Sequence, residues 1–264
     1  MEEKIYFKNS NDLKLCGILT KPKEKTTNCI ILCHGITVDK DEGGIFTELA
    51  QKLAKNGFTA FRFDFRGHGE SEGNSIDLTV TGEKKDLESV IKFLQSLGYK
   101  KFGIVAASFG AGAASLFTSE HQSIVKAICL WNPVIDYHSI LKPELPWPKK
   151  NFGKEAMKKL KRKGFIEIGN RRFKIGREFF LNLRKLYPWQ KLKKVNIPIL
   201  FVHGNKDSYV PYNDSVKYSR IFKNAELITI KGAKHGFHVR KKDAEEADQA
   251  TINFFLKTIK GNLR

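Results

Sequence analysis

Short apolar runs alternate along the chain with segments in which apolar residues recur at helical spacing. The runs are continuous, rich in Ile, Val and Phe and bounded by turn residues, which is typical of strands buried on both faces of a parallel sheet. They cover residues 13–19, 29–33, 59–63, 102–107, 127–131, 199–202 and 227–230. The helical patterns cover residues 46–55, 83–97, 110–119, 213–222 and 244–259. This alternation predicts an α/β fold with a mostly parallel, doubly wound central sheet flanked by helices.

The pattern departs from this alternation at two places. Residues 4–8 and 13–19 are joined by Asn9-Ser-Asn-Asp12, which predicts an antiparallel hairpin at one edge of the sheet. Between residues 133 and 190 no buried strand is predicted; two short alternating runs around Gly169-Asn170 instead indicate a second hairpin. After Gly176, the apolar residues 179, 180, 183, 186 and 187 fall on one helical stripe. We interpret residues 133–190 as a cap inserted over the carboxyl ends of the strands, and residues 1–132 and 191–264 as the core.

Charge is unevenly distributed in a way that supports this division. The chain of 264 residues has a formal net charge of +19. Residues 141–194 hold eighteen Lys and Arg against four Glu, a net of +14, which leaves only +5 for the remainder. The basic segment is therefore a distinct module. It could attract anionic substrates or bind weakly to an anionic surface. We favour the simpler interpretation, a solvated lysine-rich surface.

The length of the chain and its cysteines limit the number of domains, the cellular location and the cofactors that we expect. The chain is long enough for one large domain, and it contains neither an apolar run of eighteen residues nor a basic, apolar leader at its start. We therefore expect a cytosolic protein. The four cysteines form no C-x-x-C pair, so we expect buried reduced thiols and neither a metal nor another cofactor.

A candidate nucleophile lies where the apolar run 102–107 gives way to a helical pattern. Ser108 occupies the turn, and a strand that passes into a helix through one residue forces a strained backbone there. That strain requires very small residues two positions before and after, as Ala106 and Gly110 are. The N–H of Phe109 then faces the same space as the serine hydroxyl. On this turn alone, a nucleophile and an ordinary buried serine are equally good interpretations.

The partners of such a serine follow at the ends of later strands. Asp207 lies just beyond the run 199–202, and His235 lies just beyond the run 227–230. The order Ser, Asp, His supplies a nucleophile, an orienting acid and a base. Asp214 and His238 are alternatives, but Asp214 is expected in the first turn of a helix and His238 lies farther from its strand. His34, His68 and His203 are interpreted as turn and hydrogen-bonding residues.

A second oxyanion donor is expected in the loop His34-Gly35-Ile36-Thr37, directly after the run 29–33. We assign this role to the backbone N–H of Ile36, beside that of Phe109.

These motifs, together with residues 61–71 (Phe-Arg-Phe-Asp-Phe-Arg-Gly-His-Gly-Glu-Ser), resemble the α/β-hydrolase family over nearly the whole chain. More narrowly, the sequence resembles bacterial feruloyl (cinnamoyl) esterases and monoacylglycerol lipase-like or lysophospholipase-like hydrolases. The resemblance implies a metal-free acyl-enzyme mechanism with Ser108, Asp207 and His235 as the catalytic triad and a cap that shapes the acyl pocket. Ala106 departs from the first glycine of the family's turn. The loop Arg66-Gly-His-Gly69 is structural in such proteins.

The leading hypothesis is a serine carboxylic ester hydrolase acting on small to medium acyl or aromatic, feruloyl-like esters. A serine peptidase or a thioesterase of the same fold shares the triad and stays open, as does a non-catalytic protein that binds through its basic insertion. Trp147, Phe165 and Phe173 are candidates for the wall of the acyl pocket, with core packing of the cap as the equal alternative. No nucleic-acid partner is expected.

Overall fold

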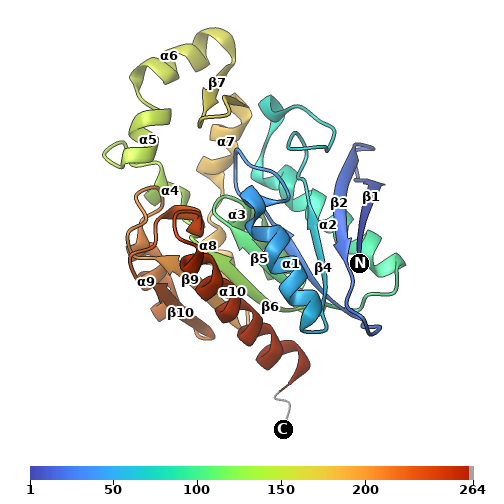
Figure 1. The fold of residues 1–264 in the computed structure, drawn as a ribbon. Coiled ribbons are helices and arrows are strands. Elements are labelled where there is room, and N and C mark those ends of the chain that lie inside the picture. Colours follow the sequence, from blue (N-terminus) through green and yellow to red (C-terminus); the bar gives the residue numbers. More distant parts are fainter. Residues whose placement is uncertain (262–264) are drawn as a thin grey trace.

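A single eight-stranded sheet runs through the molecule (Figure 1). The structure is a computed structural model and describes residues 1–261. The strands of the sheet are β1 (Glu2–Lys8), β2 (Lys14–Thr20), β3 (Asn28–Cys33), β4 (Thr59–Phe63), β5 (Lys101–Ala107), β6 (Val125–Trp131), β9 (Ile199–Gly204) and β10 (Ala225–Ile230). Their spatial order is β1-β2-β4-β3-β5-β6-β9-β10. Strands β1 and β2 form the antiparallel edge hairpin, and the neighbours from β4 to β10 are parallel. The predicted fold class is confirmed.

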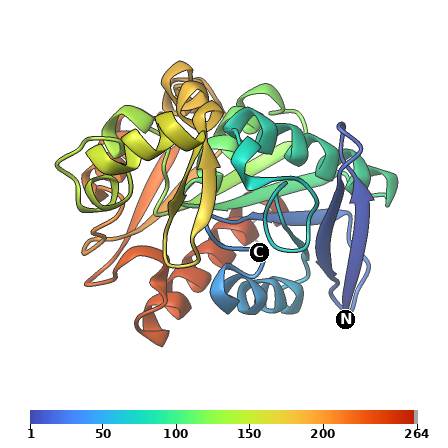
Figure 2. The same cartoon turned by 90° about the horizontal axis from the view of Figure 1, so that it is seen from above.

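Helices cover both faces of this sheet, which is why its central strands are continuously apolar (Figure 2). Helices α1 (Ile45–Lys55) and α10 (Lys241–Phe255) pack on one face, with Leu49 and Phe255 fully buried. Helices α2 (Val80–Ser96), α3 (Gly110–Glu120), α8 (Pro188–Leu192) and α9 (Tyr212–Ile221) pack on the other face. A five-residue π-helical turn, Leu256–Lys260, follows α10. None of the helices in residues 1–261 combines the length and the apolar character that a membrane crossing needs.

Two predicted boundaries differ from the observed ones for local reasons. Helix α2 begins at Val80 rather than at Glu83, because the side chain of Thr79 accepts a hydrogen bond from the N–H of Gly82 (3.0 Å) and caps the helix there. The stripe predicted to reach Tyr187 belongs to helix α7 (Arg177–Lys185), which ends earlier. Tyr187 precedes Pro188, and a proline disfavours helical backbone at the residue before it.

The segment between β6 and β9 forms a layer of its own above the carboxyl ends of the strands (Figure 1). It contains α4 (Tyr137–Ile140), α5 (Pro146–Asn151), α6 (Lys154–Lys163), β7 (Phe165–Ile168), β8 (Phe173–Gly176) and α7, and α8 leads from it back to the sheet. Strands β7 and β8 pair antiparallel, with Ile166 opposite Ile175. Their buried faces share one apolar cluster with Phe109 and Ile36, so this layer packs directly on the loops after β5 and β3.

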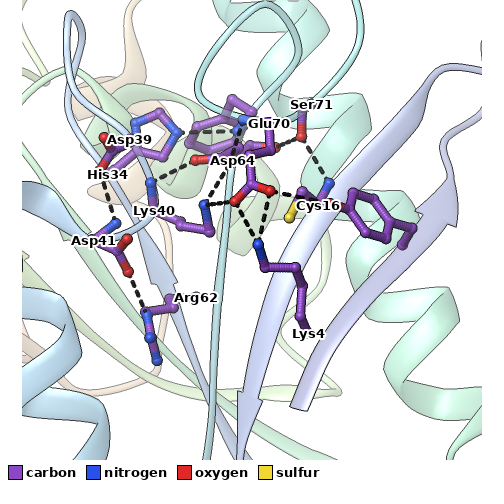
Figure 3. Close-up of polar contacts among 12 residues, drawn as sticks. Lys4, Cys16, His34, Asp39, Lys40, Asp41, Arg62, Asp64, Glu70 and Ser71 are labelled. Carbon is purple, nitrogen blue, oxygen red and sulfur yellow. Dashed lines mark hydrogen bonds and ion pairs between the residues drawn. The ribbon is translucent and has the colours of Figure 1, made fainter. Parts of the chain in front are cut away.

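A charge network centred on the buried pair Asp64 and Lys40 fixes the loops after β3 and β4 (Figure 3). Asp64 is fully buried and accepts hydrogen bonds from the backbone N–H of Lys40 (2.6 Å), from Lys40 Nζ (3.1 Å) and from the N–H of Glu70 (2.9 Å). Lys40 Nζ also donates to Glu70 (2.9 Å), whose carboxylate accepts in turn from Lys4 Nζ (2.8 Å). Ionic groups buried this deeply require partners, and the network supplies them across three segments of the chain.

Removing Asp64 is therefore expected to destabilise the fold far more than removing an exposed acid. Asp64→Ala leaves the ammonium of Lys40, which is 4% exposed, without its buried counter-ion, and we expect a loss of about 3–5 kcal/mol in the free energy of unfolding. The matched control is Glu3→Ala, whose ion pair with Lys21 is half-exposed, with an expected loss of less than about 1 kcal/mol. Urea unfolding of both variants measures the difference; equal losses would contradict the role of the network.

Candidate active site

Ser108 lies in the tight turn between β5 and α3 with a φ of 49°, in the left-handed region that residues other than glycine rarely adopt. Backbone hydrogen bonds hold it there: its N–H donates to the carbonyl of Trp131 (2.9 Å), and its carbonyl accepts from the N–H groups of Val134 (2.9 Å) and Ala111 (3.2 Å). The turn leaves no room at Gly110, where a Cβ would collide with the carbonyl oxygen of His34. The methyl group of Ala106 is fully buried in the core. This is the local geometry that the sequence pattern predicts.

Asp207 lies just beyond β9 and accepts four hydrogen bonds. Its Oδ1 accepts from the N–H groups of Tyr209 (2.7 Å) and Val210 (2.9 Å). Its Oδ2 contacts His235 Nδ1 (2.7 Å) and His203 Nε2 (3.2 Å). Burial opposes its ionisation, but His235 and His203 outweigh it and hold the pKa of this carboxyl well below its ordinary value. Asp207 is therefore ionised at neutral pH.

His235 is oriented by this contact. Since Asp207 accepts only, the proton lies on Nδ1 of His235, and Nε2 keeps its lone pair for another partner. Among residues 1–261, no hydrogen bond joins His235 to the hydroxyl of Ser108. Such bonds are often long before a substrate binds.

The two alternatives named from the sequence lie elsewhere. Asp214 is in the first turn of α9, where burial raises its pKa and Ser139 donates to it. His238 lies against the turn at Gly43, with its Cε1 3.0 Å from a Cβ built there. Neither residue takes part in the contact between Asp207 and His235.

The loop after β3 is held by His34 (Figure 3). This residue is buried, and its ring centroid lies 5.1 Å from that of Phe65. His34 Nε2 accepts from the N–H of Phe65 (3.0 Å), so the proton lies on Nδ1, which donates to the carbonyl of Gly35 (2.7 Å). Burial lowers the pKa of His34 to about 4, so the ring is neutral at pH 7. The carbonyl of Gly35 and the N–H of Ile36 belong to one trans peptide and point in opposite directions. His34 thereby fixes the direction of the Ile36 N–H.

The N–H groups of Ile36 and Phe109 share a further property. Both residues are buried, at 9% and 4% exposure, yet neither N–H has an acceptor within the part of the chain that the structure describes. Buried backbone donors without partners are rare in proteins. They lie on the two loops that meet at Ser108, since a Cβ built on Gly35 would be 3.1 Å from Ser108 Cβ. Two unpaired donors beside a serine can stabilise a developing oxyanion.

The aromatic residues proposed for the pocket wall have different surroundings. The ring of Trp147 lies 6.0 Å from that of Phe109, next to Ser108 in the chain. Phe173 stacks on His68 with ring centroids 4.5 Å apart. Phe165 instead lies beneath the ammonium groups of Lys174 (5.4 Å) and Lys159 (6.0 Å). Trp147 is therefore the candidate of the three that contacts a neighbour of Ser108.

The hairpin β7–β8 touches the loop after β3 at its tip. A Cβ built on Gly169 would be 3.3 Å from Thr37, and Arg171 pairs with Asp39 (3.2 Å). The N–H of Gly169 is itself held by Asn151 (3.1 Å). This contact places the inserted layer over the loop that carries Ile36.

Within residues 1–261, two clusters present atoms of the kind that ligate metals, but their carboxylates already have cationic partners. In the cluster of Cys16, Asp64 and Glu70, the ammonium of Lys40 contacts both carboxylates. In the cluster of Glu88, Glu120 and His121, Lys84 contacts both carboxylates. Neither donor set therefore fits a divalent cation.

Sequence reasoning missed two residues of this site. His203 was interpreted as a turn and hydrogen-bonding residue without a place in the site; it is fully buried, accepts from Ser215 Oγ at Nδ1 (2.8 Å) and donates to Asp207 from Nε2. Its position four residues before Asp207, at the end of a strand, was the available signal. Glu42 carried no signal in the sequence, but its carboxylate accepts from the N–H of Gly35 (2.7 Å).

Comparisons with known proteins show which sequences and folds this chain is similar to. A family model described as "Serine aminopeptidase, S33" matches residues 24–164, and one described as "TAP-like protein" matches residues 184–260. An acyl transferase of Shewanella woodyi is 26% identical over 82% of this chain and 71% of its own length. A putative esterase/lipase of Haemophilus influenzae is 25% identical over 82% of this chain and 80% of its own length.

Among solved structures, Est1E from Butyrivibrio proteoclasticus with bound ferulic acid superimposes with a TM-score of 0.82 at 23% identity, over 97% of this chain and 99% of that one. At this identity the likeness establishes the fold. The first family model, in contrast, matches more than half of the chain. The protein therefore belongs to the α/β-hydrolases of the serine aminopeptidase S33 family and has an esterase-type hydrolase fold.

Proposed function

We propose that the protein is a serine carboxylic ester hydrolase that works through an acyl-enzyme intermediate, with Ser108 as nucleophile, His235 as base and Asp207 as the orienting acid. The observation that carries the proposal is the 2.7 Å contact between Asp207 Oδ2 and His235 Nδ1, formed in the two loops that the order Ser, Asp, His requires. The left-handed turn at Ser108 and the unpaired N–H groups of Ile36 and Phe109 support it.

The chemistry follows from these positions. His235 Nε2 takes the proton of Ser108 Oγ as the oxygen attacks the ester carbonyl, and the N–H groups of Ile36 and Phe109 stabilise the oxyanion. The ionised Asp207 stabilises the imidazolium that forms. His235 then passes the proton to the leaving alcohol, and the acyl group stays on Ser108. A water molecule, deprotonated by His235, releases the acid and restores the serine.

The substrate class follows from the walls of the site. We propose that residues 133–190 form a cap, and that its aromatic residues accept a small to medium acyl group or a feruloyl-like one. Ring contacts of Phe109 with Trp147 (6.0 Å) and Phe179 (5.7 Å) support an apolar acyl side. The structural neighbour Est1E binds ferulic acid, which agrees with an aromatic acyl group. Phe173, stacked on His68, is proposed to border the same space.

A second candidate is acyl transfer to an acceptor other than water. It is favoured by relatives described as acyl transferases, one of them 26% identical to this chain. The acyl-enzyme would be the same, and a thiol ester or an amide could supply the acyl group. The reactivity of different leaving groups separates an esterase from a thioesterase or a peptidase.

A cytosolic location stays a prediction. It agrees with four cysteines that are all buried and free of disulfide bonds.

A panel of substrates tests the proposed activity. We expect the wild type to hydrolyse p-nitrophenyl acetate, p-nitrophenyl butyrate and methyl ferulate faster than an acyl thioester or an aminoacyl anilide. Ser108→Ala removes the nucleophile and is expected to lower kcat at least about 1,000-fold. Initial rates at several substrate concentrations give kcat and KM separately. A Ser108→Ala protein with full activity, or a wild type inactive on the whole panel, would refute the assignment.

The same Ser108→Ala protein tests the non-catalytic alternative. A protein that binds through its basic insertion would bind DNA or anionic vesicles in a salt-dependent way with or without the serine. We expect esterase activity in the wild type and no retention on DNA at physiological salt. Strong retention combined with an inactive wild type would favour the binding interpretation.

His203 is expected to act as a positioning residue for Asp207. Its Nε2–H is the second donor to Oδ2, and a hydrogen bond to a charged group is worth about 1.5–3 kcal/mol. We expect His203→Phe to lower kcat about 10- to 100-fold with little change in KM. His203→Gln, whose amide N–H2 can replace the ring donor, should recover part of this loss. An unchanged kcat in the folded Phe variant would contradict the role.

A further inference from the structure

We propose that Glu42 is a positioning residue of this site, which holds the loop that carries the Ile36 N–H and stabilises the charged form of His235. The inference rests on the proposed esterase mechanism and adds to it an acid outside the Ser-Asp-His set. Glu42 lies in the short turn Glu42–Gly44 that connects the loop after β3 to helix α1.

Glu42 has a strained backbone conformation. Its φ is 46°, which a residue with a side chain rarely adopts. The strained position is occupied by Glu42 even though two glycines, Gly43 and Gly44, follow directly. The flanks are pinned: the N–H of Glu42 donates to the carbonyl of Asp39 (2.9 Å), and Asp41 Oδ1 accepts from Arg62 Nε (2.8 Å) (Figure 3). The side chain is 7% exposed. Backbone strain is common at functional sites, so a strained residue with a buried carboxylate near a candidate nucleophile is a candidate for a function.

The carboxylate holds the loop directly. Glu42 Oε2 accepts from the N–H of Gly35 at 2.7 Å, and Oε1 would be 3.7 Å from a Cβ built on Gly35. The same hypothetical Cβ would be 3.1 Å from Ser108 Cβ. Gly35 is thus in close contact with both the Glu42 carboxylate and Ser108.

Both peptides of Gly35 are therefore fixed by side chains. Glu42 binds the N–H of the peptide before Gly35, and His34 Nδ1 binds the carbonyl of the peptide after it (2.7 Å). The N–H of Ile36 belongs to that second peptide. A change at Glu42 frees one end of Gly35 and allows the Ile36 donor to rotate away from the position of the oxyanion.

The electrostatic surroundings give Glu42 its second role. Burial raises the pKa of Glu42 to about 7, while the N–H of Gly35, the charge of His235 and the charge of Arg171 lower it and Asp39 raises it. Arg171 faces the group from the hairpin β7–β8, Asp39 from its own loop, and the ring of His238 lies against the neighbouring Gly43. Ionised Glu42 and protonated His235 therefore stabilise each other. In the reaction His235 becomes an imidazolium, so an ionised Glu42 lowers the barrier.

Two substitutions separate positioning from charge. In Glu42→Gln, the amide oxygen can still accept from the N–H of Gly35, but the negative charge is lost. In Glu42→Leu, both are lost. With p-nitrophenyl acetate at pH 8, we expect kcat to fall about 5- to 10-fold in the Gln variant and at least about 10-fold further in the Leu variant, with KM within twofold. Glu48→Gln, the same change on the exposed face of α1, is the matched control and should leave kcat unchanged.

The pH profile provides a readout that a purely structural role would not affect. Protonated Glu42 and the Gln side chain are both uncharged, so the ratio of wild-type to Glu42→Gln kcat/KM should lie near one at about pH 5. As the pH rises through about 7, Glu42 ionises and this ratio should grow to about 5- to 10-fold. A ratio that stays constant across this interval would overturn the electrostatic role.

Stability against pH tests the buried acid without any turnover. The pKa of Glu42 is higher in the folded state (about 7) than its ordinary value of 4.5, so the folded protein holds this proton more tightly. Its contribution to stability is complete below pH 4.5 and is lost as pH rises through about 7. The unfolding midpoint of the wild type should fall across this interval relative to that of Glu42→Gln. Parallel midpoints would contradict the buried, titrating carboxylate.

Labelling with a fluorophosphonate distinguishes failure of this proposal from failure of the esterase mechanism. A wild type that is neither labelled at Ser108 nor active would overturn both. A wild type that is labelled and active, with Gln and Leu variants of unchanged kcat, would overturn the role of Glu42 alone. Should the Leu variant fail to fold, the comparison of the wild type with Glu42→Gln still decides.

Discussion

The close approach of two backbone segments, the turn after β5 and the loop after β3, is the constraint on which this site depends. Gly110 has no space for a side chain against the carbonyl of His34, and Gly35 has barely any against Ser108. The end of strand β6 and the loop after it complete the arrangement, since hydrogen bonds to Trp131 and from Val134 hold Ser108 in its left-handed conformation. Three neighbouring strands therefore determine where the serine and the two unpaired N–H groups lie. The inserted layer packs on this arrangement from above.

The charges around this backbone arrangement are compensated individually. Asp207 has two backbone donors and two histidines, and Asp64 has the buried Lys40. His34 and His203 each have hydrogen-bond partners at both ring nitrogens, which fixes the orientation of each ring. Glu42 differs because its single hydrogen bond only partly offsets burial, so its pKa lies near neutrality. The protonation state of such an acid depends on the charges around it. Its role therefore has to be inferred from its surroundings in the fold rather than from its position in the sequence.

The sequence was informative wherever local pattern decides the structure. Buried parallel strands are continuous apolar runs, so the sheet and its edge hairpin could be predicted, and Ser108, Asp207 and His235 were selected because each follows such a run. The predicted helix boundaries were wrong where a single side chain overrides the pattern. Thr79 caps α2 so that it begins at Val80 instead of Glu83, and Pro188 prevents the helical stripe after Gly176 from reaching Tyr187. His203 and Glu42 bind Asp207 and Gly35, four and seven residues away along the chain. Only the spacing of His203 from Asp207 was a signal in the sequence, because the turn that brings Glu42 to Gly35 has no residue pattern of its own.

The central claim is that the acyl group passes through Ser108. Its most direct measurement is peptide mass spectrometry after acid quench, within milliseconds of mixing the protein with p-nitrophenyl butyrate. The account predicts a butyryl group on the peptide that contains Ser108, formed as p-nitrophenol is released and lost again at the rate of turnover. Steady hydrolysis with no acyl group on Ser108 at any time, or with the group on another residue, would contradict it.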